Sequence, residues 1–276
     1  MSNLFLKDVP IENHPIRGRD VSVYRADLVP QTPLASYLKM IELYPFIQNL
    51  AKTYKCMGYY AVPQSEWVGS IIPLAESVGV HPIIGISNTK VMPEYVRTID
   101  DKYLYKLSPN IYNVNFARTK KYVESQGGFM VPMGLECKEV VDGLTDFLKT
   151  HPIPKADNVI VPTGSGVALC GIVNHLGTSS KIWSICTRPA KSVEKVVDKY
   201  VPGFGDKKQS FGLFASKKKD IQVIFQDALK LPEKHQPFPM HRFWDYNAFC
   251  WLDDNIDKLK GSICFINLGS GERSGQ

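Results

Sequence analysis

Short apolar runs alternate with longer amphipathic segments along most of this chain. Residues 158–161 and 181–186 are short and largely apolar, which favours buried strands. Residues 138–149 instead repeat apolar positions every three or four residues, which predicts a helix with one buried face. Strands and helices that alternate at this spacing form parallel sheets with right-handed crossovers. The pattern therefore predicts an α/β fold.

The same pattern divides the chain into two predicted lobes. Residues 1–50 and 141–276 make the larger lobe, and residues 51–140 make a smaller α/β lobe. In the smaller lobe we expect strands at 56–62, 82–86, 103–107 and 129–132, and helices at 65–78, 92–99 and 114–125. In the larger lobe we expect strands at 21–28, 158–161, 181–186, 221–225 and 262–268, and helices at 36–43, 138–149, 191–200 and 244–259. Residues 1–20 are polar and contain prolines, so we expect an irregular lead-in.

Composition is that of an ordinary soluble globular protein. The chain has 276 residues, of which 44% are hydrophobic and 22% are charged. No run approaches the roughly 18 apolar residues that span a membrane. The first residues lack the charged, apolar and small-residue order of a signal peptide, so we expect a cytoplasmic protein. The six cysteines are scattered without a C-x-x-C pair, which argues against disulfides and against a metal site.

A glycine turn interrupts the apolar run 158–173 at Thr163-Gly164-Ser165-Gly166. In a strand–turn–helix of this kind the backbone N–H groups converge and the helix dipole adds positive potential, which suits a phosphate. A tight turn between packed elements is an equally good interpretation of these four residues. The turn lacks the ending of a P-loop and the full G-x-G-x-x-G spacing, so a nucleotide fingerprint is not indicated.

Four stretches together resemble the fold-type II pyridoxal-phosphate enzymes. These include the tryptophan synthase β chain, cysteine synthase, and the aminocyclopropane-carboxylate deaminase and D-cysteine desulfhydrase group. The matching stretches are 24–28 followed by Lys39, the loop 62–67, the 163–166 turn, and 267–271 at the end of the last predicted strand. They occur in the order of that family and on the expected elements. The resemblance implies a two-lobed parallel-sheet fold and pyridoxal 5′-phosphate as cofactor.

The resemblance also assigns roles to individual residues. Lys39 corresponds to the lysine that binds the cofactor covalently, and Ser65 to a residue that binds the substrate carboxylate or transfers a proton. Ser270 corresponds to the residue that faces the pyridine nitrogen, and Glu66 stands where the family usually has an asparagine beside the phenolic oxygen. The phosphate would be held by Thr163, Gly164, Ser165 and Gly166.

Several of these residues also have structural interpretations. Ser65 is equally suited to cap a helix, and we expect Arg25 and Asp27 to form a structural ion pair. Helical spacing predicts core positions for Trp244, Tyr246, Phe249 and Trp251.

The implied reaction is a lyase reaction at the α-carbon of an amino acid. The sharper hypothesis is decarboxylation, or elimination, of an amino acid appended to 5-hydroxymethyluracil in bacteriophage DNA, because the chain is short and carries a net charge of +6. Lysines that would then contact DNA phosphates are Lys207, Lys208, Lys217, Lys218 and Lys219. Such a protein would work in the host cytoplasm, and the family is commonly homodimeric. Two alternatives stay open: a deaminase or β-eliminase of a free amino acid, and a non-catalytic α/β protein that binds a phosphate or a nucleotide.

Overall fold

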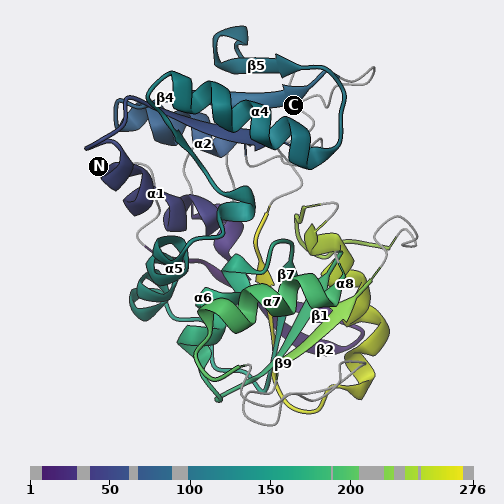
Figure 1. The fold of residues 1–276 in the computed structure, drawn as a ribbon. Coiled ribbons are helices and arrows are strands. Elements are labelled where there is room, and N and C mark those ends of the chain that lie inside the picture. Colours follow the sequence, from purple (N-terminus) through teal and green to yellow (C-terminus); the bar gives the residue numbers. More distant parts are fainter. Residues whose placement is uncertain are drawn as a thin grey trace. The chain divides into compact units, whose positions relative to one another are not determined.

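A computed structural model describes residues 8–29, 38–61, 68–88, 99–187, 189–204, 221–226, 234–241 and 244–269 (Figure 1). The chain forms two compact units. One runs from Leu43 to Leu135, and the other contains the N-terminal strands and the chain from Glu136 onward. Helix α1 (Leu38–Leu50) begins in the second of these and continues into the first. Below, the unit with the N-terminal strands is called the large unit and the other the small unit.

A six-stranded sheet forms the centre of the large unit. Its strands are β1 (Ile11–Ile16), β2 (Arg19–Arg25), β7 (Asn158–Thr163), β8 (Lys181–Cys186), β9 (Ile221–Phe225) and β10 (Ile263–Asn267). They lie in the order β1-β2-β10-β7-β8-β9. All neighbouring pairs are parallel except β1 and β2. The predicted parallel sheet is therefore confirmed, and its five parallel strands end at one carboxyl edge.

The prediction of an irregular lead-in was wrong, because residues 11–16 form a strand. Arg17 and Gly18 both have positive φ, 46° and 74°, which is the geometry of a two-residue hairpin turn. The turn pairs β1 with β2 in antiparallel register, so that Ile11 lies opposite Tyr24. An edge strand exposes alternate residues and tolerates Pro15, and its sequence is therefore polar.

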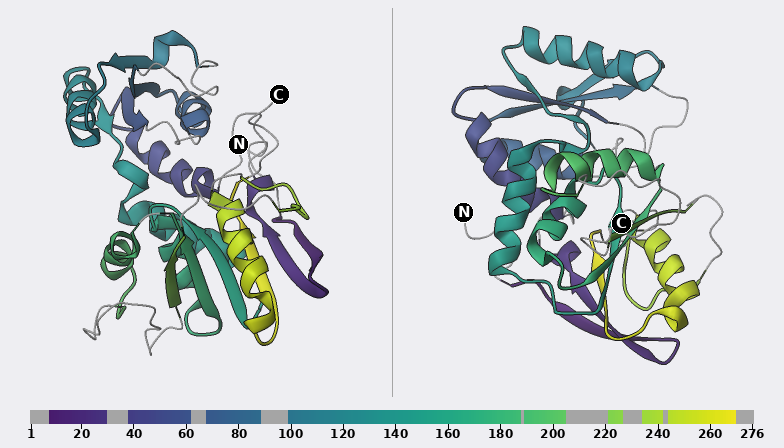
Figure 2. Two further views of the ribbon diagram at one scale, coloured as in Figure 1. Left: turned by 90° about the vertical axis from the view of Figure 1, so that its right-hand side faces the viewer. Right: turned by 60° about the horizontal axis from the view of Figure 1, so that its bottom comes forward.

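Helices cover both faces of this sheet (Figure 2). Helices α6 (Val167–Leu176) and α7 (Ala190–Tyr200) lie on one face, and α5 (Lys138–Thr150) packs against α6. Helix α8 (Trp244–Asn255) lies on the other face and continues into the 3₁₀ turn η5 (Ile256–Lys258). The core between α8 and the sheet contains Val23, Ile160, Phe249, Leu252 and Phe265.

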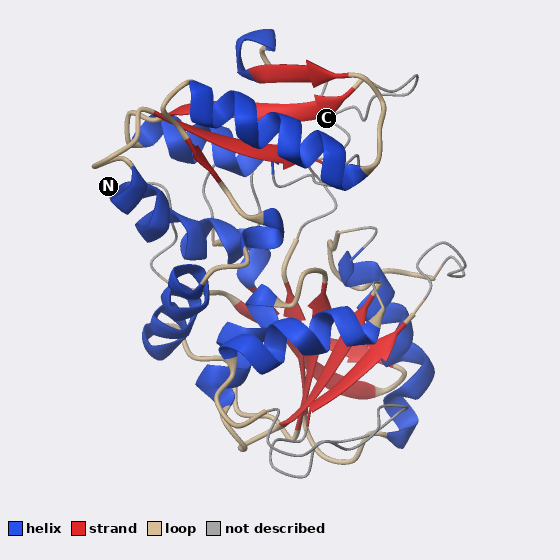
Figure 3. Ribbon diagram, viewed as in Figure 1, coloured by secondary structure: helices blue, strands red, loops and turns tan. Residues whose placement is uncertain are grey.

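The small unit contains a four-stranded parallel sheet of its own (Figure 3). Its strands, in the order β5-β4-β3-β6, are β3 (Cys56–Ala61), β4 (His81–Ser87), β5 (Leu104–Leu107) and β6 (Phe129–Met130). Helix α4 (Tyr112–Ser125) covers one face and α2 (Val68–Ser77) the other. Short 3₁₀ turns lie at Asp101–Tyr103 (η2) and Met133–Leu135 (η3). The predicted strands and helix 114–125 are confirmed, whereas the predicted helix 92–99 lies almost wholly outside the described residues.

Within the described parts of the chain, no helix is long and apolar enough to cross a membrane.

Packing of α5 on α6 depends on Gly171. A Cβ atom at this position would lie 2.6 Å from Leu144 Cδ2, and Leu144 is fully buried. We expect Gly171→Ala to lower the free energy of unfolding by about 1–3 kcal/mol, because the added methyl overpacks the core. Urea denaturation measures this loss. In a Leu144→Ala background the same change should cost less, since the overlapping Cδ2 and Cγ atoms are gone, but not nothing, because the Leu144 Cβ remains 2.8 Å from the added methyl. An equal cost in both backgrounds would show that the overlap is not its cause.

Candidate functional site

The 163–166 turn lies at the carboxyl end of a fully buried strand of the large unit. Every residue of β7 is buried, and its neighbours are β10 on one side and β8 on the other. The chain leaves the strand at Thr163 and enters α6 at Val167, with Gly166 as the N-cap residue in the left-handed region at φ 93°. The predicted strand–turn–helix is confirmed, and the turn lies at the sheet edge where open parallel sheets bind ligands.

Among the described residues, the start of α6 has no side-chain cap at its N-cap position. The first helical bond runs from Cys170 N–H to Gly166 O, at 3.1 Å. Gly166 has no side chain to cap the helix, and the first turn contains no acidic residue. The Ser165 hydroxyl reaches Val167 N–H only at 3.5 Å. The positive end of the helix dipole and the N–H groups of the first turn favour an anion such as phosphate at a buried helix start.

The two glycines of the turn are present for different reasons. At Gly166 the positive φ disfavours any other residue, and a Cβ atom would come within 3.3 Å of Val193 Cγ1. At Gly164 a Cβ atom would make only an ordinary contact, 3.6 Å from the Trp244 ring. The fold therefore requires glycine at 166. At 164 the fold leaves room for a small side chain, and because glycine does not fill this space, a ligand can approach the backbone there.

A pair of buried hydroxyl groups fixes the start of the turn. The Thr163 hydroxyl donates to Val161 O at 3.1 Å and accepts a hydrogen bond from the Ser184 hydroxyl at 2.7 Å. Both side chains are almost fully buried. Thr163 thus holds the end of β7 against β8 with its side chain pointing away from solvent.

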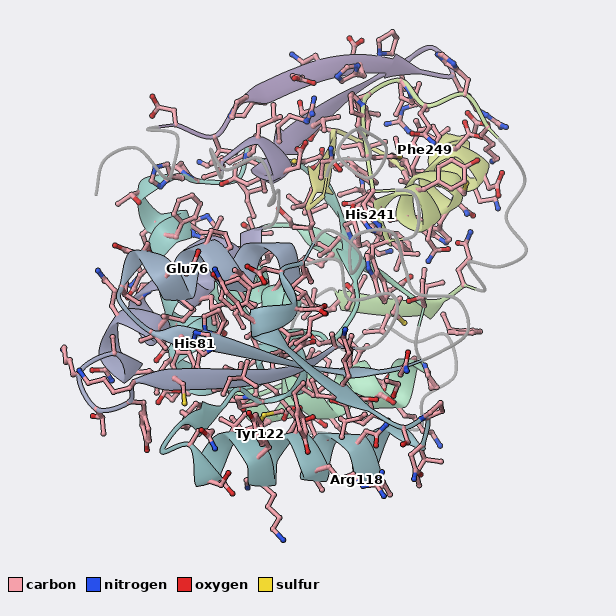
Figure 4. All side chains as sticks on the ribbon, turned by 90° about the horizontal axis from the view of Figure 1, so that it is seen from above. Glu76, His81, Arg118, Tyr122, His241 and Phe249 are labelled. Carbon is pink, nitrogen blue, oxygen red and sulfur yellow. The ribbon has the colours of Figure 1, made fainter. Side chains whose placement is uncertain are left out.

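Helix α8 begins beside the ends of both β7 and β10. Its first residue, Trp244, lies against Gly164, and the next, Asp245, accepts the N–H of Leu268 through Oδ1 at 2.7 Å. His241 precedes the helix; its N–H donates to Gly269 O at 2.6 Å, and its Nδ1 accepts the Trp244 N–H at 3.1 Å (Figure 4). The strand end that leads towards Ser270 is therefore held by the start of α8.

Two buried acids lie near this edge, and their surroundings differ. Asp27 forms two hydrogen bonds of 2.9 Å with the Arg25 guanidinium, which also contacts Glu12 at 2.7 Å. The predicted structural ion pair of Arg25 and Asp27 is confirmed. Burial raises the pKa of Asp245 well above its ordinary 3.8; the hydrogen bond from Leu268 lowers it, and nearby Asp27 raises it further.

The structure brings together one group of the predicted site residues, which is the 163–166 turn. Lys39 is the second residue of α1, so its predicted place in the first turn of a helix is confirmed. The remaining predicted positions lie outside the described residues: Ser65, Glu66, Ser270, Lys207, Lys208, Lys217, Lys218 and Lys219. Their roles stay predictions.

Sequence reasoning missed the part played by the start of α8. It assigned Trp244, Tyr246, Phe249 and Trp251 to the core. Phe249 is indeed buried in the core cluster, and Tyr246 and Trp251 pack against that cluster. Trp244 is half-buried and faces the turn instead. The sequence offered one indication of a special role for Asp245, which is that this acidic residue lies among aromatic residues in a predicted helix. Its partner Leu268 is 23 residues away, and no local pattern connects the two.

A scan against models of known protein families finds no match, and neither does a search of curated proteins. The search of solved structures does find similar folds. An ACC deaminase homologue superposes with a TM-score of 0.72 at 16% identity, over 96% of this chain and 90% of that one. A threonine deaminase from Solanum lycopersicum superposes with a TM-score of 0.67 at 11% identity, over 98% of this chain and 85% of that one. An L-serine ammonia-lyase from Rhizomucor miehei superposes with a TM-score of 0.66 at 12% identity, over 98% of this chain and 95% of that one. The chain has the two-lobed parallel-sheet fold of the fold-type II pyridoxal-phosphate enzymes.

Proposed function

We propose that this chain is a pyridoxal-phosphate-dependent lyase that acts at the α-carbon of a free amino acid. The observation that carries the proposal is the start of α6, where a glycine turn leads from the carboxyl edge of the sheet into a helix whose N-cap residue, Gly166, has no side chain. The names of the similar structures support the reaction class, since they are deaminases and an ammonia-lyase. Deamination by elimination is therefore the reaction we favour.

The described residues fit the phosphate end of this cofactor. Gly164, Ser165 and Gly166 would hold the phosphate through backbone N–H groups, with the dipole of α6 adding to the attraction. Thr163 takes no direct part, because its hydroxyl is already used within the sheet. When bound, the cofactor supplies an electron sink that stabilises negative charge at the substrate α-carbon.

The other roles follow from the family resemblance. Lys39 would hold the cofactor covalently and act as a base once its amine is released. Its place at the start of α1 helps, because the positive end of the helix dipole disfavours a protonated amine. Ser65 would bind the substrate carboxylate or transfer a proton, and Ser270 would face the pyridine nitrogen without protonating it. A carboxylate at Glu66 would repel the phenolic oxygen unless it is protonated or turned away.

The DNA-linked substrate remains a narrower hypothesis. It depends on the net charge of +6 and on the lysines at 207, 208 and 217–219. Assays with a free amino acid and with amino-acid-bearing duplex DNA, at low and high salt, separate the two substrates. Activity on DNA that is insensitive to salt would count against phosphate contacts by these lysines.

Covalent attachment of the cofactor tests the proposal directly. We expect the protein mixed with pyridoxal phosphate to develop a visible absorbance band, and borohydride followed by peptide mapping to find the reduced adduct on Lys39. Lys39→Ala should abolish both signals, whereas Lys52→Ala, at an exposed position, should leave both unchanged. An adduct on another lysine, or no band at all, would leave a phosphate-binding protein without this chemistry.

The two glycines of the turn provide a matched pair of variants. We expect Gly166→Ala to lower the free energy of unfolding by about 1–2 kcal/mol, because it forces a side chain into the left-handed region. Gly164→Ala should change it by less than about 0.5 kcal/mol, since the added Cβ makes an ordinary contact. Despite this, Gly164→Ala should weaken pyridoxal phosphate binding about tenfold, or about 1.4 kcal/mol, because it narrows the approach to the backbone. Thermal unfolding and cofactor titration measure the two effects. Unchanged cofactor affinity in Gly164→Ala would place the phosphate elsewhere.

A further inference from the structure

Two buried oxygen atoms beside the end of β10 lack a hydrogen-bond donor. Asp245 and Asn267 are both fully buried. One polar atom of each side chain is used: Asp245 Oδ1 accepts from Leu268 N–H at 2.7 Å, and Asn267 Nδ2 donates to Pro239 O at 2.8 Å. The other oxygens, Asp245 Oδ2 and Asn267 Oδ1, have no partner among the described residues. Burying a polar atom without a partner is costly, so both require one.

Both side chains lie in the same layer, between α8 and the sheet. Asn267 follows Phe265 by two positions on β10, so the two point to the same face of the sheet. Phe265 packs in the core cluster that contains Leu252 of α8. Asp245 lies on that side of α8 as well, and it already bonds the residue that follows Asn267. The two unpaired oxygens therefore lie in the same buried layer, near the end of β10.

A proton on Asp245 would supply the donor that this pair lacks. Pro239 O is an acceptor, which fixes the Asn267 amide nitrogen towards it and leaves the amide oxygen as the unpaired atom. An ionised Asp245 would also be an acceptor only. Two acceptors enclosed together repel each other, whereas a carboxylic acid offers the missing donor.

We propose that Asp245 is a neutral carboxylic acid in the folded protein, and that its Oδ2–H donates to Asn267 Oδ1, directly or through one enclosed water. With the Leu268 bond, this gives Asp245 a donor and an acceptor role at once. One proton then ties the start of α8 to the end of β10.

The charged groups around Asp245 agree with a neutral acid. Asp27, from the turn after β2, contributes negative charge, and the Arg25 guanidinium is occupied by Asp27 and Glu12. His241, before α8, uses its Nδ1 to accept the Trp244 N–H. None of the described cations forms an ion pair with Asp245. The dipole of α8 and the backbone N–H groups of Leu268, Asp245 and Gly269 favour an anion here, but burial without a counter-ion is the larger effect and raises the pKa of Asp245.

The role of this proton at the site rests on the proposed function. Asp245 holds Leu268, two residues before Ser270, the residue proposed to face the pyridine nitrogen. Asp245 is therefore a positioning residue: it acts on the cofactor through the strand end and does not touch it. Asp245→Asn keeps a donor and an acceptor, whereas Asp245→Leu keeps neither.

The test is the dependence of stability on pH, measured by urea unfolding of the full chain without cofactor. A folded-state pKa above the unfolded one means that the group's stabilisation is complete below the unfolded pKa and falls as pH rises towards the folded pKa. The wild type should lose stability with rising pH relative to Asp245→Asn. Asp253→Asn is the control, because Asp253 lies on the same helix and its Oδ2 pairs with Lys234 Nζ at 2.7 Å. This variant keeps Asp245, so its stability should fall with rising pH as that of the wild type does. The infrared band of a protonated carboxyl group at neutral pH should vanish in Asp245→Asn only.

Parallel pH profiles for the wild type and Asp245→Asn, with no protonated-carboxyl band, would overturn the proposal. This result does not depend on the cofactor, so it is separable from a failure of the proposed function, which is the absence of a visible band in the wild type. With cofactor, Asp245→Asn should bind pyridoxal phosphate like the wild type, and Asp245→Leu should bind it more weakly. If Asp245→Leu fails to fold, the pH profile and infrared band of Asp245→Asn still decide the question.

Discussion

The way in which β7 ends determines the rest of the carboxyl edge. All six residues of this strand are buried, so the chain must turn where water is scarce and backbone groups need partners. It does so through Gly166 in the left-handed region and starts α6 at once. Most of α6 is apolar and buried, and its first turn contains no acidic side chain. An anion bound at this point would accept hydrogen bonds from the start of α6 and so would stabilise the fold as well as fill the site.

Helix α8 couples this turn to a second strand end. Two successive residues, Trp244 and Asp245, contact Gly164 and Leu268, which belong to the ends of β7 and β10. Since these two residues are adjacent in one helix, a displacement of either strand end would change the contacts of the start of α8 with the other. The two buried acids of this region, Asp27 and Asp245, differ in their neighbours: Asp27 has a guanidinium within hydrogen-bond distance, whereas Asp245 has backbone N–H groups and no ion pair among the described residues.

Much of the fold could be predicted because buried parallel strands are short, apolar and separated by amphipathic helices. Strands β8 and β9 were located to the residue for that reason. Strand β1 was missed because an edge strand has a polar face and its hairpin turn depends on the unusual φ of Arg17, which composition does not reveal. The 163–166 turn was recognisable from its glycines. The role of Asp245 was not, because it depends on a contact across 23 residues that only the folded chain creates.

The strand order also has a consequence for the synthesis of this protein. Strand β10 lies between β2 and β7, yet it is the last strand of the sheet to leave the ribosome. Until residues 263–267 emerge, β2 and β7 each present an unpaired edge, whereas the strands of the small unit are all available much earlier. The large unit therefore closes late, through contacts between residues far apart in the chain, which slows folding and prolongs the exposure of aggregation-prone edges. Strand β1 pairs with the other edge of β2 during this interval, and its own outer edge carries Glu12, Asn13 and Pro15, which disfavour further strand pairing.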